Sequence, residues 1–274
     1  MGSLSILNNI SSLEAQNSLS TTQMSLNGTL EALSTGQKIN SGADDPAGLA
    51  IANGLEANVT ALTQSVQNAT DGVGMLQVAD GALSQVTTLL NTAVSLATEA
   101  ANGTLSSGQD ASLDAQYQSI LSEITSIGSN TTYNGQQIFS GNTLTIFMSD
   151  STHQGTSQVT VNMATLSSAG LTLSTTDLKT AGDAATALTA INTAIAAIAS
   201  QRGALGASSN QLQAATNVMN AQITNLTSAE SGIMDADIGT ETSNLSKYSI
   251  LQQTGIAALQ QSNSMQQNVL KLLQ

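Results

Sequence analysis

Apolar residues recur along this chain three, four and seven positions apart, which is the spacing of one face of an α-helix. The first stripe predicts a helix over about 4–34, and the next predicts a helix of about fifty residues after Pro46. Leu113 begins a shorter stripe that ends near Gly128, and a later stripe holds seven heptad positions in a row. We therefore expect a mainly α fold of long, antiparallel, coiled-coil-like helices.

The long stripes are narrow, and we interpret them as an intramolecular seam between helices. The residues expected on that seam are Leu55, Leu62, Val66, Val73, Leu205, Leu212, Met219 and Leu226. The only proline, Pro46, follows Asp45, and this pair predicts a helix start. Asp45 can cap the new helix while Pro46 occupies the first turn, where a missing N–H costs nothing.

The period changes from helical to strand-like between Gln136 and about Leu173. "LTIFMS", "QVTVNM" and "LTLS" alternate apolar with polar residues and are rich in Thr, Val and Ile, which is typical of strands. "DSTHQGTS", between the first two, predicts a hairpin loop. A β region this short cannot stand alone, so we expect it to pack on the helices in the middle of the chain.

The closing segment keeps an apolar stripe, because Leu251 begins a run of four apolar residues spaced by seven. It predicts a helix over about 244–274 whose first partner is the N-terminal helix, through the opening stripe that begins at Ile6. That pairing should be weak alone, because Gly255 and several Gln interrupt the apolar face, so other copies must supply the remaining burial. The residues expected at this interface between copies are Ile6, Ile10, Leu13, Leu251, Ile256, Leu259, Met265, Val269 and Leu272.

The helices at the two ends of the chain are each other's natural partners, so we expect discontinuous domains. Residues 1–40 and 236–274 would form a domain of terminal helices. Residues 41–142 and 181–235 would form a long-helix domain, with the small β region of 143–180 packed on it.

Composition excludes several classes of protein. Charged residues make up 8% of the chain and the net charge is −13, so nucleic acid and anionic membranes would be repelled. No cysteine occurs, which excludes disulfides, thiol catalysis and Cys-ligated metals. The first thirty residues lack a signal-peptide pattern and no segment reaches 18 apolar residues, so we expect neither a cleaved signal nor a membrane span.

Candidate catalytic residues are sparse. His153 is the only histidine and lies in the predicted hairpin loop without a second ligand nearby, so we interpret it as an exposed loop residue. No phosphate-binding loop or nucleophile elbow occurs. Asp235, Asp237 and Glu241 resemble a calcium loop only faintly, because the spacing to a bidentate glutamate is too short. We expect no enzyme activity, no metal and no cofactor.

Several segments together resemble bacterial flagellin. They are "SGADDPAGLAIANGL", "VQNATDGVGMLQVADGAL", "LATEAANGT", "YNGQQIFSG" and a long closing block that begins "NQLQAATNVMNAQITNLTSAESGIMDADIGTETSNLSKYSILQQ". The resemblance covers about 1–142 and 181–274. The insertion between these parts is short, so the chain is similar to a minimal flagellin without large outer domains.

This resemblance implies a structural subunit that polymerises into the extracellular flagellar filament for motility, with the terminal helices in its inner core. It also implies export in an unfolded state through the flagellar type III channel. The terminal helices are then expected to be disordered in the free subunit and to fold on assembly, because polar, aromatic-poor helices cannot offset their ordering entropy alone. The implied partners are other copies of the chain, an export chaperone on the C-terminal helix, the filament cap and hook-associated proteins.

Many flagellins are detected by a vertebrate Toll-like receptor, and enteric members carry an arginine and a glutamate in the region that it contacts. In an ungapped comparison Thr92 occupies the arginine position and Ser119 the glutamate position, whereas Leu96 keeps a leucine. The resemblance therefore implies weak activation of that receptor.

Three alternatives stay open. A hook–filament junction protein shares the terminal helices but usually lacks so full a flagellin ending. A flagellin with a zinc protease in its central insertion would need a His-Glu-x-x-His motif and a longer insertion. An adhesin or a secreted coiled-coil effector would account for the helices but not for the series of motifs.

Overall fold

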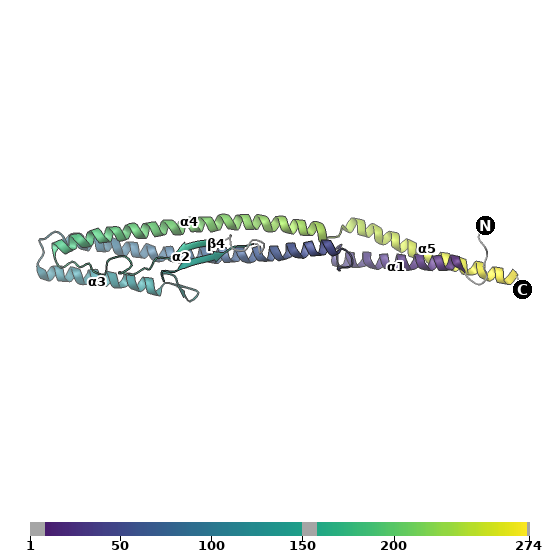
Figure 1. The fold of residues 1–274 in the computed structure, drawn as a ribbon, viewed down its shortest axis with the longest axis horizontal. Helices are drawn as coiled ribbons and strands as arrows, with labels where there is room; N and C mark the ends of the chain where they lie inside the picture. The colour runs from purple at the N-terminus through teal and green to yellow at the C-terminus, as the bar shows by residue number, and fades with distance from the viewer. Residues whose placement is uncertain (1–8, 150–157, 273–274) are drawn as a thin grey trace. The chain divides into compact units, whose positions relative to one another are not determined.

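The computed structural model describes residues 9–149 and 158–272, which fold mainly into long helices (Figure 1). The helices are α1 (Ile10–Thr35), α2 (Pro46–Ala100), α3 (Ser107–Asn130), α4 (Ala181–Met234) and α5 (Ile238–Leu272). The strands are β1 (Thr132–Tyr133), β2 (Gln136–Gln137), β3 (Thr143–Phe147) and β4 (Gln158–Asn162). The expected mainly α fold with a small β region in the middle of the chain is confirmed.

The chain forms two compact units. Unit 1 joins the two ends of the sequence, Met1–Glu56 and Asn225–Gln274, and unit 2 is the continuous middle, Ala57–Thr224. The unit boundaries therefore fall inside α2 and α4, whereas the expected domains meet at the loops that end α1 and α4. The finer division into terminal-helix, long-helix and β domains stays a prediction.

The break between α1 and α2 has the expected chemistry. α1 ends at Thr35 and is capped by Gly36, whose φ of 76° lies in the left-handed region that favours glycine. Asp45 caps α2, because its Oδ1 accepts the backbone N–H groups of Ala47 (3.1 Å) and Gly48 (3.0 Å). Pro46 is the first residue of α2, so the predicted helix start is confirmed.

The core of unit 2 follows one face of α2. Within unit 2 the buried positions of this helix step by three and four residues, as in a coiled-coil seam. They are Leu62, Ser65, Ala69, Gly72, Leu76, Ala79, Leu83, Val86, Leu90, Ala93, Ala97 and Ala100. The other two helices complete the core with Leu113, Tyr117, Leu121 and Ile124 from α3 and Ala184, Ala187, Ile191, Ala194, Ile198, Leu205, Leu212 and Met219 from α4.

Two buried positions of α2 carry residues that an apolar pattern does not select. Ser65 Oγ donates to the backbone oxygen of Ser149 (3.0 Å) and accepts from its N–H (3.1 Å). A Cβ on Gly72 would collide with the end of the Ile146 side chain, so the glycine leaves room for that side chain of β3 beside the helix. Serine and glycine thus dock the β region onto α2, and the valines that follow them are only half-buried.

β3 and β4 form a two-stranded antiparallel hairpin with an apolar inner face. On the inner face Ile146, which is buried, pairs with buried Val159. Two amides tie the hairpin to the helices of unit 2. Asn68 Nδ2 of α2 donates to the backbone oxygen of Phe147 (3.2 Å), and Gln201 Nε2 of α4 donates to that of Asn162 (2.8 Å). These bonds attach the β3–β4 hairpin to α2 and α4, while the packing of the whole 143–180 region as a separate domain stays a prediction.

The expected third strand is wrong. Residues 171–174, "LTLS", form a turn in which Leu171 and Leu173 are buried and Thr172 is exposed with a φ of 59°. The alternation arises because this turn buries the residues on both sides of an outward threonine, so no strand is needed to produce it. The predicted hairpin loop, which contains His153, lies outside the described residues.

β1 and β2 form a short antiparallel hairpin that the hydrophobic pattern did not predict. Its two-residue turn is Asn134 and Gly135, with φ values of 49° and 77°. Asn-Gly is the preferred sequence for such a turn, because both central residues need a positive φ. The dipeptide itself was therefore the available signal.

Among the described residues, one helix meets the length and composition criteria for a membrane span. α4 has an 18-residue window with a mean hydropathy of 1.2, of which 28% is buried. The same helix supplies Ile191 and Ile198 to the core of unit 2. Since core helices meet the same criteria, this window alone is weak evidence of a membrane.

Candidate subunit interface

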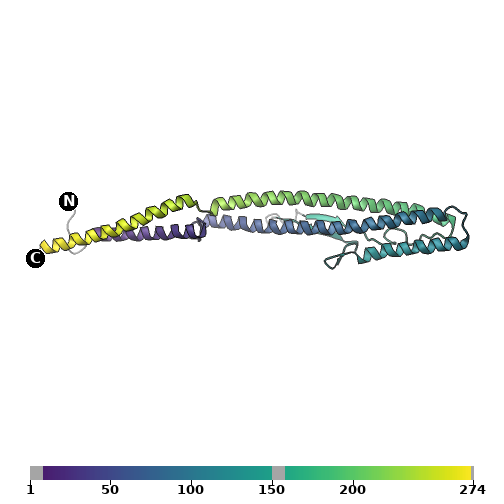
Figure 2. The same cartoon turned by 180° about the vertical axis from the view of Figure 1, so that it is seen from behind.

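α1 and α5 lie side by side in unit 1 and meet through polar side chains (Figure 1 and, from behind, Figure 2). Asn9 Nδ2 donates to the backbone oxygen of Ser262 (3.3 Å), and the Ser262 hydroxyl donates to Asn9 Oδ1 (3.2 Å). Ser12 Oγ donates to Asn263 Oδ1 (3.3 Å). The start of α1 is thus fixed to α5 by hydrogen bonds and not by apolar packing.

The middle of this pair contains small and amide side chains. A Cβ on Gly255 would lie 3.3 Å from Leu19 Cδ1, so the glycine leaves room for the leucine. Three residues earlier on α5, Gln252 Nε2 donates to Gln23 Oε1 (2.5 Å). Within the described ranges, α1 and α5 are the one helix pair that keeps an extended run of Cα–Cα distances within 8 Å. Small residues permit this close approach, because the distance between helix axes depends on the side chains at the contact.

Several large apolar side chains of both helices lie outside this seam. Ile10 and Leu13 of α1 are each 62% exposed, and Leu251, Ile256 and Met265 of α5 are exposed as well. The two terminal helices do pair, and their apolar stripes contribute to the seam only in part. Leu19 lies beside Gly255 and Leu26 is buried, whereas Ile10, Leu13 and Leu251 are not covered within the chain. The stretch around Gly255 lets α1 approach closely because it carries small and polar side chains.

The other four residues predicted to contact other copies are Ile6, Leu259, Val269 and Leu272. Leu259 is half-buried beside the polar seam. Ile6 lies outside the described residues, as do the side chains of Val269 and Leu272. Contact between copies at all nine positions stays a prediction.

All eight residues predicted for the intramolecular seam are buried or half-buried. The buried ones are Leu62, Leu205, Leu212 and Met219, and the half-buried ones are Leu55, Val66, Val73 and Leu226. Leu55 and Leu226 belong to unit 1, and the other six belong to unit 2. Their membership of one continuous seam stays a prediction.

The three receptor-related positions carry no charge. Thr92 and Ser119 are exposed, and Leu96 is half-buried. Thr92 Oγ1 donates to the backbone oxygen of Thr88 (3.2 Å), and Ser119 Oγ donates to that of Ala115 (2.9 Å). Both hydroxyls are therefore satisfied within their own helices.

An ion pair joins α2 to α4 within unit 2. Arg202 Nε donates to Asp80 Oδ1 (2.7 Å) and its Nη2 donates to Asp80 Oδ2 (3.1 Å), which is a bidentate arrangement. The hydrogen bond from Arg202 holds the pKa of the Asp80 carboxyl below its ordinary value of 3.8. Both side chains are more than one third exposed, so solvent and salt weaken the attraction.

Asp237, in the segment that faintly resembles a calcium loop, caps a helix instead. Asp237 Oδ1 accepts the backbone N–H of Gly239 (2.9 Å), and Oδ2 accepts the hydroxyl of Thr240 (2.8 Å). The hydrogen bond from the Thr240 side chain is the main cause of a lowered pKa at Asp237. Across 9–149 and 158–272 no group of three or more His, Cys, Asp or Glu side chains is arranged to hold a metal ion.

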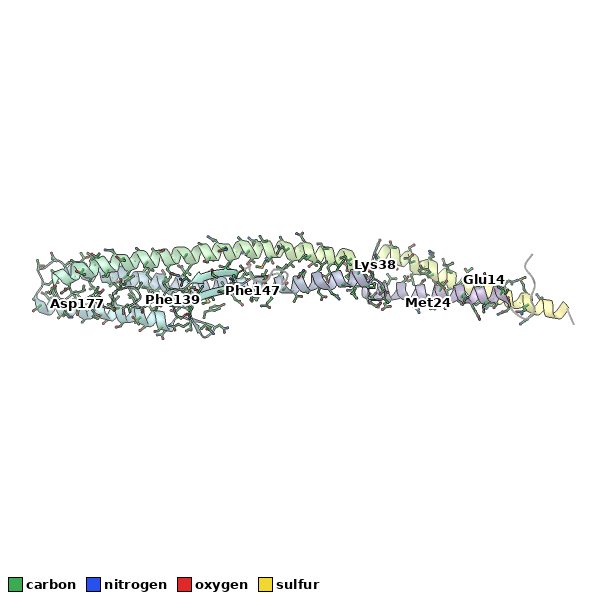
Figure 3. The ribbon with its side chains drawn as sticks, in the orientation of Figure 1. Glu14, Met24, Lys38, Phe139, Phe147 and Asp177 are labelled. Atoms are coloured by element: carbon green, nitrogen blue, oxygen red, sulfur yellow. The ribbon has the colours of Figure 1, made fainter. Side chains whose placement is uncertain are left out.

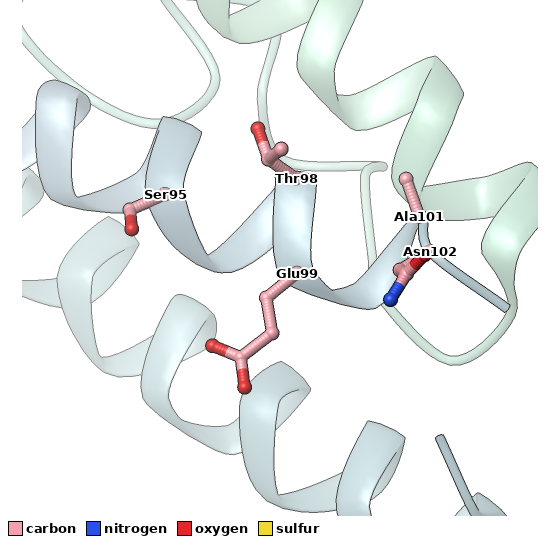
Figure 4. Close-up of a pocket in the computed structure, with 5 residues that line it drawn as sticks. All are labelled: Ser95, Thr98, Glu99, Ala101 and Asn102. Carbon is pink, nitrogen blue, oxygen red and sulfur yellow. The ribbon is translucent and has the colours of Figure 1, made fainter. Parts of the chain in front are cut away.

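The hollows on the described surface are shallow. One of about 610 Å³ lies at the end of α2 and is lined by Ser95, Thr98, Glu99, Ala101 and Asn102 (Figure 4). The side chains of Thr98 and Glu99 point in different directions, so they do not converge on a common ligand (Figure 4). The chemistry of this protein is therefore better sought on its surfaces than in a pocket.

The spacing of apolar residues does not predict the polar contacts between α1 and α5. Gln252, Gly255, Leu259 and Ser262 step by three, four and three residues, so the helical spacing was present in side chains of mixed polarity. Asn9 carried a second signal, since it caps α1 by accepting the backbone N–H of Ser12 (3.1 Å).

Comparisons with known proteins match both ends of the chain to one family. The model of the bacterial flagellin N-terminal helical region matches residues 6–143, and that of the C-terminal helical region matches residues 188–273. A flagellin of Halalkalibacterium halodurans is 30% identical over 245 residues, which are 89% of this chain and 90% of that protein. The crystal structure of Bacillus cereus flagellin is 29% identical, with a TM-score of 0.50, and the match covers 60% of this chain and 94% of that one.

Longer relatives match one part of the chain. Flagellin 1 of Proteus mirabilis is 40% identical over 48% of this chain, and B-type flagellin of Pseudomonas aeruginosa is 38% identical over 50% of it. The matched segment spans only 36% and 28% of those two proteins. The family models and the match to the Halalkalibacterium protein, which spans most of both chains, show that this chain belongs to the bacterial flagellin family.

Proposed function

We propose that this protein is a structural subunit that polymerises into the bacterial flagellar filament. The observation that carries the proposal is the inverted arrangement of unit 1, in which α1 and α5 pair through polar side chains and leave Ile10, Leu13 and Leu251 exposed. Removing apolar surface from water stabilises an assembly by roughly 25 cal/mol per Å². Further copies of the chain are the partners that a filament supplies in unlimited number.

We also propose how the subunit leaves the cell and where it assembles. The subunit is exported unfolded through the flagellar type III channel and joins an extracellular filament, and the absence of cysteine keeps it free of cross-links on the way. Pairing of α1 and α5 alone is weak, which supports folding of these helices on assembly. The other partners are an export chaperone on the C-terminal helix, the filament cap and hook-associated proteins, and the protein acts without enzymatic activity.

The proposal also assigns regions to layers of the filament. Residues 1–40 and 236–274 form the inner core, residues 41–142 and 181–235 form the surrounding long-helix layer, and the β region of 143–180 packs on that layer. Weak activation of the Toll-like receptor belongs to the same proposal, because neutral Thr92 and Ser119 stand where a charge is expected. A reporter-cell assay with an enteric flagellin as reference tests it, and equal potency would contradict it.

Filament growth on short seeds is the direct test of function. Purified protein should lengthen the seeds, as seen by electron microscopy, whereas L251S/I256S should not, because it removes two exposed apolar side chains of α5. Q253S/Q260S is the matched control, since it changes two exposed positions of the same helix without removing apolar area. Circular dichroism should show that both variants keep the helices of unit 2.

Two results would overturn the proposal. Normal growth of L251S/I256S would show that these side chains do not hold copies together. Wild-type protein that stops at short oligomers on every seed would favour the hook–filament junction alternative.

A further inference from the structure

The methionines of this chain differ greatly in exposure. Met148, Met163 and Met219 are buried, whereas Met24 is 64% exposed and Met265 is 59% exposed. Met75 and Met234 lie between these extremes as half-buried residues. Oxidation of a thioether depends on access, so Met24 and Met265 are the most vulnerable methionines among the described residues.

Both exposed methionines lie on the outward apolar faces of unit 1. Met24 follows Ile10 by two heptads on α1, and Met265 follows Leu251 by two heptads on α5. Residues spaced in this way share one face of a helix. Figure 3 labels Met24 on α1. Each thioether thus lies within a stripe that the proposed filament would bury.

We propose that Met24 and Met265 form an oxidation-sensitive modification site that controls whether the free subunit can assemble. A hydroperoxide in the surroundings, of which hydrogen peroxide is the simplest, converts the two thioethers to sulfoxides and blocks addition of the subunit to a filament. This inference rests on the proposed filament function. Its chemistry concerns the free subunit, and subunits already assembled are protected.

The reaction step is a two-electron oxygen transfer. A lone pair on the methionine sulfur attacks one oxygen of the hydroperoxide, the O–O bond breaks, and a sulfur–oxygen bond forms. The transferred oxygen passes its proton to the leaving oxygen, so hydrogen peroxide yields one sulfoxide and one water. The sulfur is oxidised, the peroxide is reduced, and no further reagent is needed.

The consequence for assembly follows from the polarity of the product. A sulfoxide carries a strong hydrogen-bond acceptor in place of a flexible apolar sulfur. In the free subunit water satisfies that acceptor, because Met24 and Met265 are exposed. Burial against an apolar surface of another copy would leave it without a donor, which disfavours the contact. Oxidation therefore weakens assembly while it leaves the free subunit folded as before.

Peptide mapping by mass spectrometry tests the selectivity of the reaction. Brief treatment of the free subunit with hydrogen peroxide should oxidise Met24 and Met265 roughly tenfold faster than Met163 and Met219. In filaments Met24 and Met265 should be oxidised no faster than Met163 and Met219. Equal rates at all methionines of the free subunit, or undiminished rates at Met24 and Met265 in filaments, would overturn the proposal.

Growth on seeds tests the consequence of the reaction. Oxidised wild-type protein should elongate seeds roughly tenfold more slowly than untreated protein. M24L/M265L has no sulfur at either position, so its elongation rate should be the same before and after the treatment, whatever that rate is relative to the untreated wild type. The matched control is M75L/M234L, which keeps both exposed thioethers and should be inhibited like the wild type.

The two proposals fail in distinguishable ways. If untreated protein does not elongate seeds, the filament function fails, whatever the pattern of oxidation. If untreated protein elongates seeds and oxidised M24L/M265L is still inhibited like oxidised wild type, the filament function stands and the modification site is rejected.

Discussion

Units 1 and 2 are both built from long helices, but they place their apolar residues in opposite ways. Unit 2 buries Leu83, Leu90 and Leu212 in a core that α2, α3 and α4 share. Unit 1 buries Leu26 and Ile39 but joins α1 to α5 partly through polar groups such as Asn9 and Ser262, and it leaves Ile10, Leu13, Leu251 and Met265 exposed. A unit that buries its leucines needs no partner to remove them from water, whereas the exposed side chains of unit 1 are the ones that we propose other copies to cover.

The difference shows that one helical spacing can serve two purposes. In unit 2 a heptad stripe marks the contact within the chain. In α5 a heptad stripe of equal regularity, from Leu251 to Met265, marks a surface that its own chain does not cover. The most regular apolar stripe of a helix therefore does not identify its intramolecular partner when that helix also carries a stripe of small and polar residues.

Truncation of a core leucine gives the largest expected effect. Leu212→Ala should lower the free energy of unfolding of unit 2 by about 2–5 kcal/mol, because Leu212 is fully buried and a cavity would remain. Val218→Ala, six residues further along α4 at a site that is 57% exposed, should change it by less than about 0.5 kcal/mol. Urea unfolding followed by circular dichroism measures both, and similar losses would show that unit 2 lacks a leucine core of its own.

Widening the polar seam should be the next largest effect. Gly255→Leu should destabilise the pairing of α1 with α5 by roughly 1–3 kcal/mol, because the new side chain collides with Leu19. Gly232→Leu is the control in the same unit, since a Cβ there meets nothing within 4 Å. In filaments, where these helices are ordered, amide hydrogen exchange across α1 should speed up only in the first variant, while exchange in unit 2 is unchanged.

Faster exchange of α1 in both variants would show that glycine at 255 has no special role in the seam. Slower exchange in Gly255→Leu would show that the two helices do not meet there at all.

Removal of one hydroxyl tests the polar contact inside unit 2. Ser65→Ala should cost about 1–2 kcal/mol of unfolding free energy, because it leaves the backbone N–H and oxygen of Ser149 without their Ser65 partner. Thr70→Ala, on the exposed side of α2, removes a hydroxyl that only bonds its own helix and should cost less than about 0.5 kcal/mol. Equal losses in urea unfolding would mean that Ser65 does not dock the β region.

The ion pair of unit 2 should give the smallest effect, with a defined pH dependence. The pKa of Asp80 is lowered in the folded state by Arg202, so the pair contributes stability above the ordinary carboxyl pKa of about 3.9 and loses it as pH falls through the lower folded value. Arg202→Gln should therefore lower the melting temperature slightly at pH 7 and not at all below the folded pKa. Lys179→Gln, whose partner Asp177 lies two residues away, is the control.

A melting-temperature difference between Arg202→Gln and wild type that stays constant from pH 7 to the acid limit would rule out the Asp80 carboxylate as its source. High salt should reduce the difference at pH 7, because both side chains are partly exposed.

The sequence predicted helices more successfully than contacts. A long 3-4 spacing forces an amphipathic helix whatever covers it, so α1 to α5 and the cap at Asp45 could be anticipated. Which face is covered depends on close approach and on side-chain hydrogen bonds, and Gly255 and Gln252 give no hydrophobic signal for either. The turn at Thr172 shows the same limit, since alternation alone cannot distinguish a strand from a turn that buries alternate residues.

The central claim is that other copies of the chain cover the outward apolar face of α5. Amide hydrogen exchange across 250–268, compared between the free subunit and the filament, tests it most directly. We predict rapid exchange in the free subunit and exchange at least roughly 100-fold slower in the filament, because contacts between copies then stabilise the helix. Equally rapid exchange in both states would contradict the claim.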